Sequence, residues 1–249
     1  MTIKIKRCFG KQALPKVTQG NNALRLQDWI NLQAQTPLLF SDNQTESMAR
    51  LLPLLLCGEQ SAQLVFNQEI IRLHVQDLDK TLSTEISQRN GKIVTSLMEV
   101  ESDECRHDIA LQTVSDKLPY IEDTRQVQRL AKRFYSGLGR VNDYSQHFVR
   151  IAILDTCVTQ IMQAFETSKL GGEHPFSVLC GLIKKDEAKH VYISRHHAIE
   201  LGATNDDFYQ QQSLITHELF QLLTSQHHSF ENMGICLDAI QHKLEEKWQ

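Results

Sequence analysis

The seven-residue stretch Lys184-Lys185-Asp186-Glu187-Ala188-Lys189-His190 contains the pattern Asp-Glu-x-x-His. The same pattern occurs earlier, in Ser102-Asp103-Glu104-Cys105-Arg106-His107. On a helix, a Glu and a His three positions apart project from one face, about one turn from each other. The two copies, 83 residues apart, can therefore direct two carboxylates and two imidazoles at a single point.

Both copies lie within apolar stripes of helical period, which face the core of helical proteins. The first stripe comprises Ile93, Leu97, Val100, Glu104, His107, Leu111, Val114 and Leu118. The second comprises Phe176, Leu179, Ile183, Glu187, His190 and Ser194. An unpaired ionised carboxylate at such a position would cost several kcal/mol, and a bound metal ion is the simplest way to remove that cost.

Another helix is predicted to begin at about Glu46 or Pro53 and to end at Asp79. Its apolar stripe contains one acid, Glu59, and a second acid, Glu69, lies beside the stripe. Both acids are candidate metal ligands, and the length of the helix distinguishes them.

If the turn to the next helix falls near residue 81, Glu59 lies 22 positions before it and Glu104 lies 23 positions after it. Two antiparallel helices then hold these acids at the same height. Glu69 would lie about 15 Å away along the axis, at ~1.5 Å per residue. We therefore expect Glu59 to be the ligand. Glu69 is the alternative if Arg89-Asn90-Gly91 breaks the following helix.

The fourth long helix, predicted over residues 143–169, also has one acid on its apolar stripe, Asp155. The midpoint between positions 155 and 187 is 171, which falls on the pair Gly171-Gly172. Because a turn at these glycines makes the flanking helices antiparallel, Asp155 and Glu187 are expected to face each other.

The remaining sequence predicts an all-α chain, because no segment shows the alternation of apolar and polar residues that is typical of a β-strand. The first Asp-Glu-x-x-His helix is expected to end at Pro119 and the second at Gly202. We expect one domain with an N-terminal arm over residues 1–45, a helical bundle with the metal site over 46–202 and C-terminal flanking helices over 203–249. Shorter helices are predicted near residues 22–34, 127–135, 206–224 and 229–248.

Composition narrows the class of protein. A net charge of −4 and a pI near 6.3 do not favour nucleic acid or anionic lipid as partners. No run of 18 apolar residues predicts a membrane span, and the first residues do not resemble a signal peptide. The six cysteines show no CxxC, which favours reduced thiols and a cytoplasmic location. They are Cys8, Cys57, Cys105, Cys157, Cys180 and Cys236.

The four long helices together offer six ligands for a pair of metal ions. Four carboxylates offset two divalent cations, which leaves a neutral buried site. Oxygen and imidazole ligands without thiolate suit iron or manganese better than copper(I) or zinc. The expected cofactor is two iron ions, with a mixed manganese–iron pair as the alternative. The predicted ligands are Glu59, Glu104, His107, Asp155, Glu187 and His190, with Glu69 as the fallback.

The twin motifs DECRH and DEAKH, in register with two single acids, resemble the ferritin-like di-iron carboxylate superfamily over about residues 50–200. That superfamily includes acyl-carrier-protein desaturases, p-aminobenzoate N-oxygenases, tRNA hydroxylases, ribonucleotide reductase small subunits and bacterioferritins. The resemblance implies a ferritin-like four-helix bundle with two irons and dioxygen as co-substrate. It also implies that Glu104 and Glu187 bridge the metals, and that Asp103 and Asp186 orient the metal-bound histidines.

The sequence departs from individual families at three positions. Asp155 replaces the more usual Glu, and its shorter side chain shifts one iron or leaves a coordination position more open. Ile183 stands where the N-oxygenase type has an additional histidine. Leu111 stands where the radical-bearing reductase subunit has tyrosine, so the resemblance does not extend to a tyrosyl radical. Desaturases share the motif type but are longer chains.

Three functions follow as expectations. The first is an O2-activating oxygenase or oxidase that hydroxylates, N-oxygenates or desaturates a small or carrier-tethered substrate, with electrons from a ferredoxin or a flavin reductase. The second is iron oxidation and storage, which requires assembly into a shell. The third, a tRNA-modifying hydroxylase, is disfavoured because phosphate neutralisation requires clustered Lys and Arg. The flanking helices could also form a homodimer surface.

Overall fold

In a computed structural model, the chain is described over residues 20–78, 84–141 and 143–248, the side chains of 76–90 and 248 excepted. Within these ranges all regular secondary structure is helical. The helices are α1 (Asn21–Gln35), α2 (Asp42–Leu78), α3 (Thr84–Ser115), α4 (Thr124–Leu138), α5 (Tyr144–Glu166), α6 (Pro175–Glu200), α7 (Asn205–Thr224), α8 (His227–Asn232) and α9 (Leu237–Trp248).

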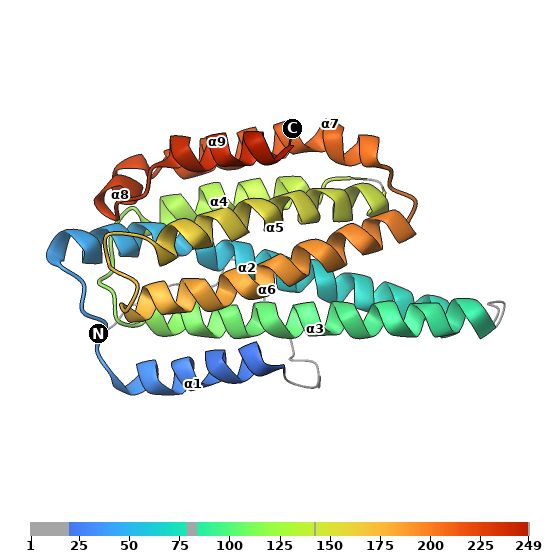
Figure 1. The fold of residues 1–249 in the computed structure, drawn as a ribbon, viewed down its shortest axis with the longest axis horizontal. Coiled ribbons are helices and arrows are strands. Elements are labelled where there is room, and N and C mark those ends of the chain that lie inside the picture. The colour runs from blue at the N-terminus through green and yellow to red at the C-terminus, as the bar shows by residue number, and fades with distance from the viewer. Residues whose placement is uncertain (1–19, 79–83, 142, 249) are drawn as a thin grey trace.

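The four long helices form two pairs of sequence neighbours, α2 with α3 and α5 with α6 (Figure 1). Helix α4 runs back along the molecule between the end of α3 and the start of α5 (Figure 1). As a result, the two pairs meet with α3 packed on α6. This arrangement brings both Asp-Glu-x-x-His motifs to the same interface.

Local signals in the sequence account for several helix ends. The Asp143 carboxylate accepts a hydrogen bond from the Ser145 backbone N–H and so caps α5. His174 caps α6, whose first residue is Pro175, where the missing N–H costs nothing. Thr204 and Asp207 form a reciprocal capping box at the start of α7. Each cap stabilises its helix end by about 1 kcal/mol.

Aromatic side chains join the two helix pairs away from the motifs. Phe66 of α2 packs edge-on against Phe148 of α5, with ring centroids 5.8 Å apart. Within the α5–α6 pair, Phe165 packs against Phe176. Such contacts contribute about 0.5–1.5 kcal/mol beyond the area they bury. On the outside, α1 packs on α3 and α6, and Trp29 donates a hydrogen bond to the Pro175 carbonyl at 2.8 Å.

The structure corrects several predicted boundaries. The single helix predicted over residues 229–248 is two helices, α8 and α9, because Gly234 adopts a left-handed φ of 77° between them. The helix predicted near 127–135 is longer, Thr124–Leu138, and the first motif's helix ends at Ser115 rather than at Pro119. Helix α2 begins at Asp42 and continues through Pro53. The predicted turn near residue 81 lies outside the described residues.

The prediction that all cysteines are reduced is wrong for Cys57, which is disulfide-bonded. Cys157 and Cys180 are buried without a disulfide, as expected of small apolar side chains.

By length and composition alone, one helix among the described residues, α5, is apolar enough to cross a membrane. However, 61% of its most apolar window is buried inside the protein. This burial is what a central core helix shows.

Candidate metal centre

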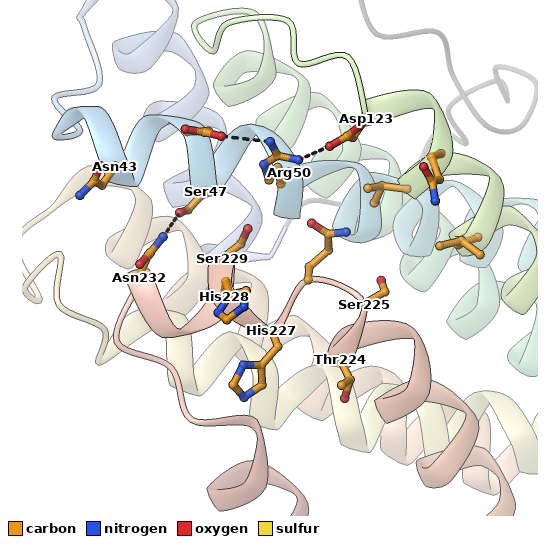
Figure 2. Close-up of a pocket in the computed structure, with 15 residues that line it drawn as sticks. Asn43, Ser47, Arg50, Asp123, Thr224, Ser225, His227, His228, Ser229 and Asn232 are labelled. Carbon is orange, nitrogen blue, oxygen red and sulfur yellow. Dashed lines mark hydrogen bonds and ion pairs between the residues drawn. The ribbon is translucent and has the colours of Figure 1, made fainter.

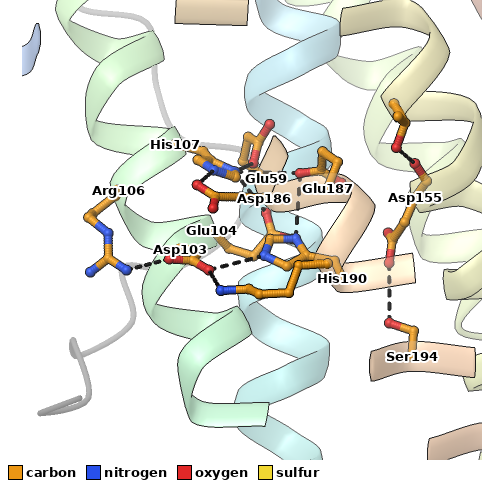
Figure 3. Close-up of polar contacts among 12 residues, drawn as sticks. Glu59, Asp103, Glu104, Arg106, His107, Asp155, Asp186, Glu187, His190 and Ser194 are labelled. Carbon is orange, nitrogen blue, oxygen red and sulfur yellow. Dashed lines mark hydrogen bonds and ion pairs between the residues drawn. The ribbon is translucent and has the colours of Figure 1, made fainter. Parts of the chain in front are cut away.

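Four side chains from three of the long helices converge in the buried interior. They are Glu59 of α2, Glu104 and His107 of α3, and Glu187 of α6. One potential ligand atom from each lies within 4.8 Å of all the others, and all four residues are buried. This group could hold a metal ion. The twin motifs meet because α3 packs on α6 (Figure 3).

The second motif histidine lies beside the same group. His190 Nδ1 is 3.1 Å from Glu104 Oε1 and 3.6 Å from Glu187 Oε1. It is buried, yet it has no hydrogen-bond partner. Native interiors rarely leave such an atom unpaired, and a bound ion is one of the explanations for it. A cation bound by this nitrogen would satisfy it.

The acid before each glutamate holds the histidine of the other motif. His107 Nε2 lies 3.2 Å from Asp186 Oδ2, and His190 Nε2 lies 3.4 Å from Asp103 Oδ2 (Figure 3). Asp103 is also bound by the side chains of Arg106 and Lys189. The motifs are therefore crossed: each Asp acts on the opposite helix.

This crossing determines which nitrogen of each imidazole is available. Because an ionised Asp only accepts hydrogen bonds, each Nε2 must carry the proton. In a neutral imidazole the Nδ1 lone pair then faces carboxylates, which are acceptors as well. His107 Nδ1 is 3.1 Å from Glu59 Oε2 and 3.5 Å from Glu187 Oε1. Acceptors facing each other at this distance require a cation between them, either a proton or a metal ion.

The directions of the pKa shifts indicate that the negative charge of the buried carboxylates needs compensation. Burial, with a further contribution from Glu104, raises the pKa of Glu59 well above its usual value, although His107 opposes this. Burial and the charges of Glu187 and Glu104 likewise raise the pKa of Asp155. Burial alone would lower the pKa of His107, but Glu59 and the other carboxylates raise it overall. The site thus binds protons where a metal ion would otherwise supply positive charge.

Asp155 is buried next to the four-residue group but is not a member of it. Its Oδ2 accepts a hydrogen bond from Ser194 of α6 at 3.2 Å (Figure 3). It lines the same cavity as Glu59, Glu104 and Glu187. Ser194 occupies the apolar stripe one turn after His190, which is the sequence signal for this contact.

Glu69, the alternative to Glu59, is buried away from the group. Arg72 binds both of its oxygens, at 2.5 and 2.6 Å, and His197 Nε2 lies 2.6 Å from its Oε1. Burial raises the pKa of Glu69, but these partners lower it overall. Its charge is therefore already compensated. Helix α3 runs through Gly91 without a break, as the height argument for Glu59 requires.

A small cavity of about 40 Å³ adjoins the carboxylates. Its remaining walls are mostly aliphatic side chains from α2, α5 and α7, and Tyr135 of α4 closes one side. Tyr135 approaches α2 at Gly58, where an added Cβ would lie 2.9 Å from the phenol oxygen. No sequence pattern pointed to Tyr135, because it lies on the connecting helix α4.

Glu101 was also missed. It lies one turn before Glu104 on α3, is buried, and neither of its oxygens has a hydrogen-bond partner. Burial, followed by the charge of Glu104, raises the pKa of Glu101 to about 7. Its spacing from Glu104 is the signal that could have identified it.

A second group of potential ligands among the described residues is exposed. His227, His228 and Glu231 of α8 lie together on the surface. Both histidines border a polar pocket of about 600 Å³ (Figure 2). Figure 2 also shows the ion pair of Arg50 with Asp123 at this pocket. Arg50 pairs with Glu46 as well. Because water already solvates these side chains, the group gives no comparable reason for a bound ion.

The class that the fold and site define is an all-helical protein with a buried carboxylate–histidine group that could hold a metal ion. Comparison with protein-family models, with curated proteins and with solved structures finds no match to this chain.

Proposed function

We propose that this protein is a non-haem di-iron oxygenase or oxidase built on a ferritin-like helical bundle. It would use dioxygen to hydroxylate, N-oxygenate or desaturate a small or carrier-tethered organic substrate. The observation that carries the proposal is the crossed pairing of the two motifs, which turns both Nδ1 atoms toward buried carboxylates.

Two ions would divide the residues according to their contacts. Glu104 and Glu187 each lie close to both motif histidines, His107 and His190. Glu59 lies 3.1 Å from His107, so it would bind the same ion as His107. Asp155 would complete the second set, as the partner of Glu187 across the α5–α6 pair. Bound iron would supply the redox chemistry that reduces dioxygen.

The protein's own part is positioning and exclusion of water. Asp103 and Asp186 hold each imidazole in one tautomer, so that Nδ1 remains a metal ligand. The four buried carboxylates favour divalent cations, because without a metal ion only bound protons compensate their charge. The aliphatic wall beside the carboxylates excludes water and gives an organic substrate a place to bind. That wall also favours an organic substrate over iron storage.

Dioxygen consumption tests the proposal. Protein loaded with ferrous iron without oxygen, then mixed with dioxygen and a reductant, should consume dioxygen faster than the same iron in buffer. Glu187→Ala should lower this rate by at least about tenfold, because it removes a carboxylate that lies close to both motif histidines and would contact both ions. Glu173→Ala, an exposed glutamate in the turn before α6, is the matched control and should retain the rate.

Equal rates in Glu187→Ala and the wild-type protein would contradict the proposal. A mass by light scattering that corresponds to a closed shell, many times 28.6 kDa, would instead support iron storage.

A further inference from the structure

Three side chains of α8 converge at the surface, apart from the buried centre. His227 Nδ1 lies 3.3 Å from Glu231 Oε2, and His228 Nδ1 lies 3.2 Å from the same oxygen. One potential ligand atom of each residue lies within 4.8 Å of the other two. In the part of the chain that the structure describes, this is the one such group of three outside the interior.

The two distances match those between ligands of a single metal ion. N–H···O hydrogen bonds are most often about 2.9–3.0 Å long, and both contacts are longer than that. A tetrahedral zinc ion, with bonds of about 2.0–2.1 Å to nitrogen and about 2.0–2.2 Å to oxygen, separates its ligand atoms by about 3.3–3.5 Å. The group therefore needs little rearrangement to bind such an ion.

The donor atoms indicate the class of ion. Imidazole suits zinc, copper, nickel and iron(II), whereas magnesium and calcium prefer ligands that are all oxygen. Three protein ligands leave one position of a tetrahedral ion open to water or to another ligand. Both histidines line the polar pocket of about 600 Å³, and the His228 side chain is 96% exposed, so this position is accessible from solvent.

The charges around the pocket also favour a cation. Arg50 lines the pocket and already pairs with the carboxylates of Glu46 and Asp123. Together with Glu231, three carboxylates lie near one guanidinium group. Because water screens these exposed charges, their contribution is small, but its sign opposes an anion and supports a metal ion.

We propose that α8 carries a second metal site, in which His227, His228 and Glu231 bind a divalent transition-metal ion such as zinc. Water solvates the group when no ion is bound, so an ion is not required there as it is in the interior, and binding is reversible. The site goes beyond the proposed function and does not depend on it.

An ion at this site would stabilise α8. The helix has six residues, and a helix this short is not stable by itself. It is held by packing on α2, by burial of Phe230, and by the hydrogen bond that the Asn232 amide donates to the Ser47 hydroxyl at 3.1 Å (Figure 2). An ion bound by His227 and Glu231, four positions apart, would join the two ends of the helix.

Zinc titration of a tag-free, metal-free Glu187→Ala protein tests the site, because this variant lacks a ligand of the buried centre. Calorimetry should show one zinc ion bound per chain and no binding of magnesium. Adding His228→Ala should weaken zinc binding by at least about tenfold, since even residues behind a metal ligand contribute that much. Zinc should also raise the Tm of the Glu187→Ala protein, but not that of the double variant.

His242→Ala is the matched control. His242 of α9 is exposed and lies 3.3 Å from Glu246, four positions on, but this pair belongs to no three-ligand group among the described residues. The substitution should leave zinc binding unchanged. If Glu187→Ala does not fold, His228→Ala in the wild-type background should bind one zinc ion fewer per chain than the wild-type protein.

Zinc binding that His228→Ala leaves unchanged, or that His242→Ala weakens equally, would overturn the site. Equal binding of magnesium would overturn the assignment to imidazole ligands. None of these results bears on the buried centre, whose ligands lie on α2, α3 and α6. Iron content of the His228→Ala protein, measured separately, therefore keeps the two proposals distinguishable.

Discussion

At the scale of single residues, the site depends on which atom of each imidazole is free. Asp186 and Asp103 occupy the Nε2 atoms of His107 and His190. The spacing of the motifs predicted that glutamates and histidines share a face, but it could not show that each Asp acts on the other helix. That crossing depends on how α3 and α6 are rotated about their axes relative to each other. The sequence of one helix does not determine this relative orientation.

Glu101 leads to a prediction about pH. Its pKa is about 7 in the folded protein against 4.5 as the usual value, so the folded state keeps a proton that the unfolded chain has released. Stability of the metal-free protein should therefore fall as the pH rises through this window. Glu101→Gln removes the free-energy cost of ionising this buried carboxyl. Above about pH 8 it should raise the free energy of unfolding by about 1–2 kcal/mol, a value reduced by solvent screening.

Below pH 4.5 the advantage of Glu101→Gln should disappear, since the carboxyl is then protonated in both states. Urea denaturation at a series of pH values measures this difference. An advantage of the same size at acid and alkaline pH would show that the carboxyl is not strained by its burial.

At the scale of helices, counting residues from a predicted turn showed which acids on neighbouring helices lie at the same height. Periodicity alone showed only which face of its helix each acid occupies. Glu59 and Glu104 are brought together because α2 and α3 are continuous on both sides of their connection. The same count separated Glu59 from Glu69, whose carboxylate instead pairs with Arg72 and His197. Position counting could not predict the Tyr135 contact, because the path of α4 depends on packing rather than on its length.

The break between α8 and α9 was not predicted, because an apolar stripe continues across Gly234. Its φ of 77° is unfavourable for residues with a side chain, and a Cβ there would overlap the side chain of Lys169. Gly234→Ala should therefore lower the free energy of unfolding by about 1–3 kcal/mol. Gly172→Ala is the control, since its φ is not positive and no atom lies near its added Cβ.

Urea denaturation of both glycine variants provides the measurement, and the control should be unchanged or slightly more stable. If Gly234→Ala were as stable as the wild-type protein, the turn between α8 and α9 would not require glycine.

At the scale of the whole molecule, the buried carboxylates connect metal binding to folding. Because the ligands come from distant parts of the chain, only the folded state assembles them. At free iron about a hundredfold above its Kd, binding adds about 2.7 kcal/mol to stability. Chelation should therefore lower Tm by roughly 5–11 °C for a chain of this length.

Glu104→Ala is the control for the chelation experiment, because a chelator should not change the Tm of a variant that binds little iron. An identical Tm of the wild-type protein before and after verified metal removal would show that iron binding does not stabilise the folded state.

Iron content per chain after anaerobic reconstitution, determined by elemental analysis, tests the central claim most directly. The wild-type protein should bind about two irons. Glu104→Ala and Glu187→Ala should lose most of this iron, whereas Glu69→Gln should retain it, because Arg72 and His197 already compensate Glu69. Wild-type protein without iron, or full occupancy in Glu104→Ala and Glu187→Ala, would contradict the account.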